Sequence, residues 1–206
     1  MKKLLPIILT CISLQSYAQP ATETAPDSNV VNKRNTFTVT VGSGVLFPTR
    51  ESRYGIARIS PGSLYSAGVE YNFKKKARNT YFSLGVQATY GSLGYAEPPV
   101  KGEQSFSMFF YSTTFNMNIP FKLTDDLNII LQLSAVPSYI KNNLPKGNRI
   151  HRGDLALQGT VMASYKRFLV GIRMYRPIGS YSFGDAPIVD NYKLNCLSGV
   201  VGFQLR

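Results

Sequence analysis

The sequence predicts an all-β fold, and more specifically an eight-stranded antiparallel up-and-down transmembrane β-barrel. Three observations predict it: apolar and polar residues alternate over eight segments, the connections alternate in length, and aromatic residues gather at two heights. Overall averages hide this pattern, because 44% hydrophobic residues and a mean hydropathy of -0.08 also fit an ordinary soluble protein.

The strand signal is a period of two residues. Between residues 36 and 47, Phe37, Val39 and Val41 fall on one parity, whereas threonines and glycines fall on the other, as in a strand with one apolar face. Most segments approach the roughly 9 to 11 residues that a tilted membrane-spanning strand needs, and an even number closes naturally into a barrel. The segments are 36–47, 63–73, 80–90, 105–121, 127–140, 155–165, 168–174 and 197–205.

The connections between these segments alternate between long and short. Long connections are predicted at 48–62, 91–104, 141–154 and 176–193, and short ones at 74–79, 122–126 and 166–167. In outer-membrane barrels the short turns and both termini face the periplasm and the long loops face outward. We therefore expect a cell outer-membrane location with periplasmic termini and extracellular long loops.

Aromatic residues of the apolar parity fall at two heights, with mostly aliphatic residues between them. Aromatic girdles at both borders of an apolar band are typical of membrane-spanning barrels, although aromatic residues also favour strands in general. One border has Phe37, Tyr71, Phe73, Phe82, Phe121, Tyr165, Phe168 and Phe203, and the other has Phe47, Tyr65, Tyr90, Phe109, Tyr111 and Tyr139.

The N-terminal segment is typical of an export signal. It combines a basic start at Lys2 and Lys3, an apolar stretch over 4–14 and the small-residue site Ser16-Tyr17-Ala18. We predict a signal peptide at 1–18, a flexible periplasmic tether at 19–35 and the barrel at 36–206. The 4–14 stretch is too short for a membrane helix, and of the two cysteines Cys11 lies in the signal, which excludes a disulfide scaffold or a Cys/His zinc site.

With these features the chain resembles the small eight-stranded outer-membrane barrels of Gram-negative bacteria. The likeness is to OmpX and the OmpA transmembrane domain, and more closely to the PorT-like "outer membrane protein beta-barrel domain" proteins. It rests on the signal, the eight alternating strands and the final strand 199–205. The family's final strand usually ends in an aromatic residue that the barrel-assembly machinery recognises; here Phe203 has that parity, but the chain ends Leu205-Arg206.

The resemblance implies a non-enzymatic, structural or interaction role, such as a PorT-like part in a secretion or envelope system, with outer-membrane lipid and the assembly machinery as partners. The first alternative is a soluble periplasmic β-barrel that binds an apolar ligand inside, as lipocalins do. In that case the polar parity would face water, but it has fewer Lys and Glu residues than a water-exposed surface normally carries. The second alternative is an outer-membrane enzyme that modifies lipid.

The inward parity predicts a barrel interior filled by polar side chains. Because a buried charge is costly without a partner, we expect an ion pair between Glu70 and Arg173. The whole inward set is Glu70, Asn72, Gln87, Asn116, Asn118, Asn128, Gln132, Gln158, Lys166 and Arg173.

No catalytic, cofactor-binding or metal-binding set emerges from the sequence. The single histidine, His151, has Asp154 nearby, but the serines at 52, 60 and 180 lie in other loops, and a lone loop histidine is weak evidence for catalysis. We therefore expect no enzymatic activity and no cofactor.

The charge of +12 becomes +10 once Lys2 and Lys3 are removed with the signal. Export argues against nucleic acid as a partner. Loop cations near the outer rim instead suggest contacts with lipopolysaccharide phosphates, and plain solvated loop charge is an equal interpretation. The candidate residues are Arg50, Arg53, Arg58, Lys146, Arg149 and Arg152.

Overall fold

The computed structural model describes residues 35–50, 58–73, 80–96, 104–143, 153–183 and 190–205. The predicted signal peptide and all of the predicted tether except Asn35 lie outside these residues. Eight long strands and two short ones, β2 (Arg58–Ser60) and β9 (Tyr181–Phe183), make up the fold. The long strands are β1 (Thr36–Arg50), β3 (Gly62–Phe73), β4 (Tyr81–Ala96), β5 (Gln104–Lys122), β6 (Leu127–Asn142), β7 (Gly153–Tyr165), β8 (Phe168–Pro177) and β10 (Asp190–Leu205).

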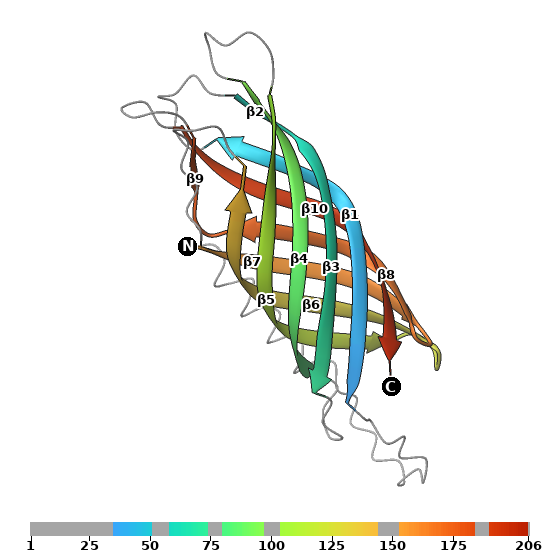
Figure 1. Cartoon of the computed structure of the whole chain (residues 1–206). Coiled ribbons are helices and arrows are strands. Elements are labelled where there is room, and N and C mark those ends of the chain that lie inside the picture. The colour runs from blue at the N-terminus through green and yellow to red at the C-terminus, as the bar shows by residue number, and fades with distance from the viewer. Residues whose placement is uncertain are drawn as a thin grey trace, which may run out of the picture. The chain divides into compact units, whose positions relative to one another are not determined.

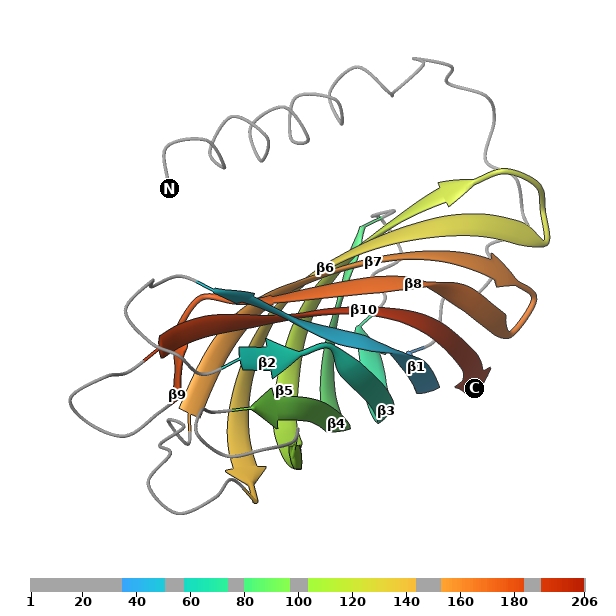
Figure 2. The same cartoon turned by 90° about the horizontal axis from the view of Figure 1, so that it is seen from above.

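The long strands close into one barrel. Each pairs antiparallel with the next along the chain, and β10 pairs with β1 to complete the ring. In Figure 1, β1, β3, β4 and β5 form the front wall, with β6, β7, β8 and β10 behind them; Figure 2 views the same barrel after a 90° turn. The predicted eight-stranded antiparallel up-and-down barrel is confirmed.

The strands are strongly tilted, as the pairing register shows. From Val41, the paired residues lead one way round the barrel through Ala67 and Ala88 to Tyr111. The other way round, the register reaches Phe121 on the same strand, ten residues further along. A stagger of this size in eight strands corresponds to a tilt of about 40°.

The two ends of the barrel differ, and we name them by their connections. At the turn-side end β1 begins, β10 ends and short turns join β5 to β6 and β7 to β8. The loop-side end bears β2, which pairs with β4, and β9, which pairs with β10. These two short strands lie within connections that the sequence predicted as loops.

The strands also extend further toward the loop side than predicted. β10 begins at Asp190, inside the predicted connection 176–193. The alternation continues there with reversed polarity, because Tyr192 and Leu194 are buried inside while Lys193 and Asn195 are half-buried on the opposite face. A prediction that requires apolar residues on the outward parity therefore begins this strand at residue 197 and not at Asp190.

The turn between β7 and β8 corrects one prediction. Lys166, predicted to point inward, is exposed in the turn with a φ of 54° and its Nζ 5.3 Å from the centroid of the Tyr165 ring. The turn between β5 and β6 carries an exposed Lys122–Asp125 ion pair of 2.6 Å, whose hydrogen bond lowers the pKa of Asp125. Within the described ranges, no helix is long and apolar enough to cross a membrane.

Candidate functional site

The outer wall of the barrel carries a continuous belt of exposed apolar side chains, here called the apolar belt. Val86, for example, is 64% exposed and Ile172 is 62% exposed, which is unfavourable in water. On β5 the belt runs from Tyr111 to Phe121, and at about 2.5 Å of height per tilted residue this spans about 25 Å. Representative members are Val39, Val41, Tyr65, Val69, Phe82, Leu84, Val86, Phe115, Phe121, Leu133, Tyr139, Leu157, Val161, Phe168, Val170, Ile172, Met174, Leu197 and Val201.

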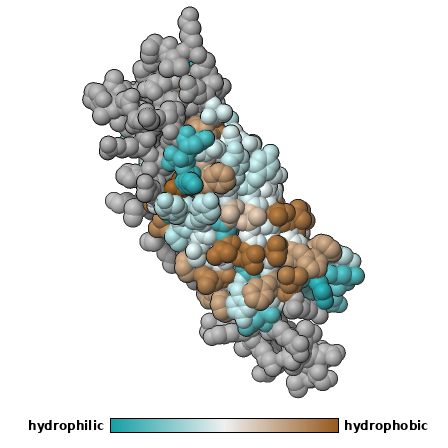
Figure 3. All heavy atoms as spheres, in the orientation of Figure 1, coloured by the Kyte–Doolittle hydropathy of each residue, from teal (hydrophilic) through white to brown (hydrophobic). Residues whose placement is uncertain are grey.

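The belt does not cover the whole height of the wall. In Figure 3 the hydrophobic residues gather over the lower part of the front wall, and paler residues cover the part nearer the loop-side end. Aromatic residues mark both borders of the belt on β4 and β5, with Phe82 and Phe121 at the turn side and Phe109 and Tyr111 at the loop side.

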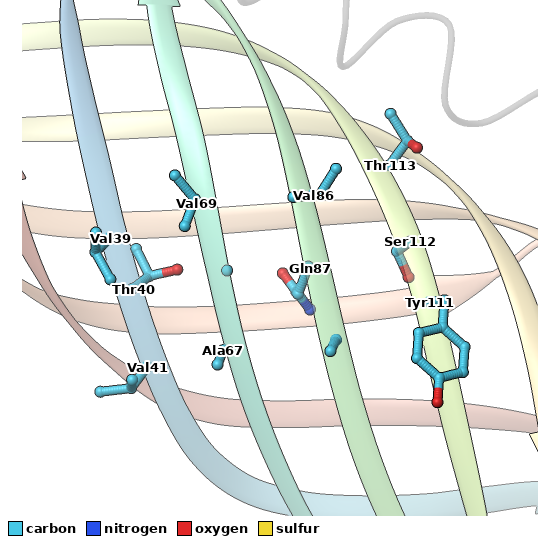
Figure 4. Close-up of a pocket in the computed structure, with 12 residues that line it drawn as sticks. Val39, Thr40, Val41, Ala67, Val69, Val86, Gln87, Tyr111, Ser112 and Thr113 are labelled. Carbon is cyan, nitrogen blue, oxygen red and sulfur yellow. The ribbon is translucent and has the colours of Figure 1, made fainter.

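A shallow hollow lies within the belt on β1, β3, β4 and β5 (Figure 4). The cross-strand pair Ala67 and Ala88 forms its floor, flanked by Val41 and Tyr111. Its outward side chains are apolar apart from Thr113 and the Tyr111 hydroxyl. The hollow therefore offers mainly a surface for hydrocarbon.

The turn-side part of the interior holds a polar, hydrogen-bonded network beside a small apolar cluster of Ile130, Met162 and Leu169. Gln132 Nε2 donates to Glu70 Oε2 and to Asn118 Oδ1, each at 3.0 Å. Ser83 Oγ donates to Glu70 Oε2 at 3.3 Å and accepts from the Nδ2 atoms of Asn116 and Asn118 at 3.0 Å. Four strands thus share one buried network, which we call the Glu70 network.

Glu70 and Arg173 both lie inside the barrel, 7% and 4% exposed. The hydrogen bonds recorded among the described residues take both side chains to neutral partners, since Arg173 Nη1 donates to Gln87 Oε1 at 2.9 Å. The two opposite charges attract each other through the low-dielectric interior. Whether this attraction stabilises the barrel as an ion pair stays a prediction.

Several buried polar atoms near Arg173 have no hydrogen-bond partner within the described part of the chain. They include both amide atoms of Gln158, Thr160 Oγ1, Ser134 Oγ and Arg173 Nε. A cavity of about 20 Å³ adjoins Gln158 and Arg173, which is room for one water molecule. Because Gln158, Thr160 and Arg173 are almost completely buried, the described interior at this level is filled apart from space for an internal water.

The loop-side part of the interior is apolar. Its buried side chains form one cluster, here called the inner apolar cluster, in which Leu46, Met108, Val136 and Leu194 have no exposed surface. The full cluster is Leu46, Ile59, Leu64, Leu93, Phe106, Met108, Phe110, Val136, Ile140, Ala156, Tyr175, Tyr181, Tyr192, Leu194 and Cys196. It includes Ile59 of β2 and Tyr181 of β9, so these short strands extend the wall around the cluster.

At the loop-side ends of the strands, the outward neighbours of this cluster are small or polar. Ser105 and Ser107 flank buried Phe106, and Lys141 follows buried Ile140. Toward the loop-side ends of the strands the wall therefore becomes more polar outside and more apolar inside, as in a barrel in water. The change is gradual, because exposed apolar side chains such as Phe109 and Tyr139 still flank the inner apolar cluster.

Asp154 occupies the loop-side end of β7 as a half-buried carboxylate. Its Oδ2 accepts hydrogen bonds from Tyr175 Oη at 2.8 Å and Tyr181 Oη at 2.6 Å. Burial, followed by the nearby Tyr175 and Asp154, raises the pKa of the Tyr181 hydroxyl, which keeps it a donor. These bonds tie β9 to the barrel wall. The sequence pattern did not predict them, because it places Asp154 in the connection 141–154.

Comparisons with known proteins support the fold. No family model and no curated protein matches the chain. Neisserial surface protein A (NspA) superposes with a TM-score of 0.50 at 13% identity, over 82% of this chain and 97% of that one. The outer membrane protein OprG from Pseudomonas aeruginosa gives 0.53 at 10% identity, over 84% and 96%. The fold is that of a small outer-membrane barrel.

Within this outer-membrane barrel fold, most of the predicted loop candidates cannot be placed. Arg53, Lys146, Arg149, Arg152 and His151 lie outside the described residues, as does Ser52, and the side chain of Arg50 is not described. Arg58 begins β2 and is exposed, as a contact with an anion requires. Among the described residues, no group of three His, Cys, Asp or Glu side chains is suited to hold a metal ion.

Proposed function

We propose that the chain is an integral outer-membrane β-barrel protein without enzymatic activity, whose role is structural or interaction-based. The observation that carries the proposal is the apolar belt, which encircles the barrel and is about as tall as the hydrocarbon core of a bilayer. Exposed to water, a belt of this extent would exceed the apolar patches that soluble monomers tolerate. A soluble barrel with an internal apolar ligand fits less well, because the largest exposed apolar side chains point outward.

The filled interior supports an interaction role over transport. The Glu70 network and the inner apolar cluster follow one another along the barrel axis, so we expect no steady ion conductance when the protein is inserted in planar bilayers. Reproducible unit steps of current from protein whose folding has been verified would contradict this part of the proposal.

Cell fractionation tests the location. We expect the protein in the outer-membrane fraction, with a gel mobility that changes on boiling because the closed barrel resists detergent until heated. Recovery of the protein in the periplasmic supernatant would refute the proposal in favour of the soluble alternative.

We further propose that the termini and turns are periplasmic and the long loops extracellular. Support comes from the short turns at one end and the β2 and β9 strands at the other. In a Cys196→Ser background, a membrane-impermeant maleimide added to intact cells should label Asn143→Cys at the loop side and leave Asp125→Cys unlabelled. Labelling of Asp125→Cys without labelling of Asn143→Cys would contradict this orientation and indicate the opposite one.

The finer role and the partners rest on the resemblance to PorT-like proteins and on the loop charges. We propose a part in a secretion or envelope system, insertion by the barrel-assembly machinery, and contacts between loop cations such as Arg58 and lipopolysaccharide phosphates. Photo-crosslinking from position 58 in living cells should give a lipopolysaccharide or protein adduct. Adducts absent at position 58 but present at belt position 86 would contradict a loop contact.

A further inference from the structure

The turn between β7 and β8 places two neighbouring cations at the turn-side border of the apolar belt. Lys166 and Arg167 are both exposed, and among the described residues neither takes part in an ion pair. Lys122, in the turn between β5 and β6, differs because it is bound to Asp125 at 2.6 Å. Lys166 and Arg167 therefore offer two positive charges to an anion at this border.

Hydrogen bonds on both sides hold this turn in place. Lys166 N donates to Asp126 O at 3.1 Å, and Arg167 O accepts from Gln204 N at 2.8 Å. The carboxylate of Asp126 is exposed and forms no ion pair within the described structure. The φ of 54° at Lys166 lies in the left-handed region, where glycine is favoured. Residues held in such sparsely populated conformations cluster at ligand-binding sites, so the lysine side chain is a candidate for binding a ligand.

The ammonium of Lys166 lies against an outward-facing ring. Its Nζ is 5.3 Å from the centroid of the Tyr165 ring, and Tyr165 is 51% exposed on the outer wall. Phe168 lies opposite Tyr165 and Phe203 lies opposite Phe168, with the two phenyl rings 5.1 Å apart. We call these three residues of β7, β8 and β10 the aromatic row. The row brings a fixed cation to the depth at which lipid headgroups meet acyl chains.

The next outward residues toward the middle of the belt are smaller than the aromatic row. They are Ala163, Val170 and Val201, which lie opposite one another on the same three strands. Val170 is 59% exposed and Val201 is 54% exposed. A lipid phosphate at the turn would therefore have a hydrocarbon surface beside it for the attached acyl chains.

We propose that this turn and the aromatic row bind an anionic glycerophospholipid, with its phosphate on Lys166 and Arg167 and its acyl chains on Val170 and Val201. The guanidinium of Arg167 suits two phosphate oxygens, and the ammonium of Lys166 adds a second positive charge. The site lies at the end of the barrel opposite to the contacts proposed for lipopolysaccharide, on the side of the phospholipid leaflet. It rests on the membrane location and the orientation proposed above.

Fluorescence quenching by brominated lipids tests this, because the chain has no tryptophan. Phe168→Trp places a single reporter in the aromatic row. The refolded variant is reconstituted in phosphatidylcholine bilayers that contain brominated phosphatidylglycerol or brominated phosphatidylcholine. We expect phosphatidylglycerol to occupy the site about fivefold better, which corresponds to about 1 kcal/mol. Adding Lys166→Gln and Arg167→Gln should reduce this ratio to about one, whereas Lys122→Gln, which removes a cation already bound to Asp125, should keep it.

A second reporter separates a local site from a general attraction of anionic lipid to a basic protein. Phe115→Trp replaces an exposed ring of the belt on β5 and should give a ratio near one, while heat-modified gel mobility verifies that each variant folds. The same preference at both reporters, or a preference that survives the double substitution, would overturn the proposal. If both lipids quench the Phe168→Trp reporter equally, this inference fails alone; if neither lipid quenches it, the proposed membrane location fails first.

Discussion

Two buried glutamines show how differently one residue type behaves inside this barrel. Gln132 and Gln158 are 1% and 3% exposed and lie on the neighbouring strands β6 and β7. Gln132 donates to Glu70 and Asn118, whereas both amide atoms of Gln158 lack a partner in the described structure. A buried polar group stabilises a fold through its hydrogen bonds and destabilises it when they are missing.

This contrast predicts opposite outcomes for a matched pair of substitutions. Gln132→Met should destabilise the barrel by about 1–3 kcal/mol, because Glu70 and Asn118 then lose a donor. Gln158→Met should be neutral or stabilising, because it removes the two unpaired amide atoms of Gln158 from the interior and keeps a side chain of similar size. Urea unfolding of the detergent-folded protein measures both; an equal loss of stability in the two variants would contradict the role assigned to the Glu70 network.

The charge of Glu70 gives a second prediction at the residue scale. Glu70→Gln keeps the shape and removes the negative charge that faces buried Arg173, so we expect the free energy of unfolding to fall by about 1–3 kcal/mol. The boiling-dependent gel shift should move to lower temperature accordingly. Asp125→Asn is the control, since that carboxylate is exposed in a turn. An unchanged transition in Glu70→Gln would refute the predicted pairing with Arg173.

Among the elements, the two-residue turn between β7 and β8 offers the clearest prediction. Lys166 has a φ of 54°, a left-handed conformation that glycine adopts freely and a residue with a Cβ does not. Lys166→Gly should therefore stabilise the barrel by about 0.5–1 kcal/mol, and the β-branched Lys166→Val should destabilise it. The urea midpoints of the two variants test this order, and the reverse order would rule out strain at this turn.

The turn-side ends of the strands were predictable and the loop-side ends were not. Near the turns, outward apolar residues such as Phe82 and Phe168 alternate with inward polar ones, and the predicted limits 73, 127, 165 and 168 match the structure. Toward the loops β4 continues to Ala96 and β10 begins at Asp190. There the alternation persists with the apolar residues inside. A prediction that expects the apolar residues to face outward therefore assigns these residues to loops.

The interior and the hydrogen bonds of Asp154 differ in the same way in how much the sequence revealed. Parity alone placed Glu70, Gln132 and Arg173 in the interior. The contact between Tyr175 and Asp154 depends on β7 beginning at Gly153, two residues before the predicted strand. The contact of Asp154 with Tyr181 depends on β9 from a different connection, and local sequence carries no signal for that proximity.

At the scale of the whole molecule, the barrel joins two kinds of wall in one set of strands. The turn-side part suits a bilayer, with the apolar belt outside and the Glu70 network inside. The loop-side part suits water, with serines and Lys141 outside and the inner apolar cluster inside. We expect the membrane to end near this border, close to Tyr111 and Tyr139, with the loop-side part outside the bilayer.

This division predicts the surroundings of individual wall positions. In a Cys196→Ser background, nitroxide labels at Val86→Cys and Ile172→Cys should collide mainly with oxygen, which concentrates in the bilayer core. Labels at Ser107→Cys and Lys141→Cys should collide mainly with a water-soluble nickel complex, because these outward positions flank Met108 and Ile140 of the inner apolar cluster. Spin-label relaxation in lipid vesicles measures both collision rates. A lipid-like profile at position 107 would mean that the bilayer reaches the loop-side end and that the polarity reversal does not mark its border.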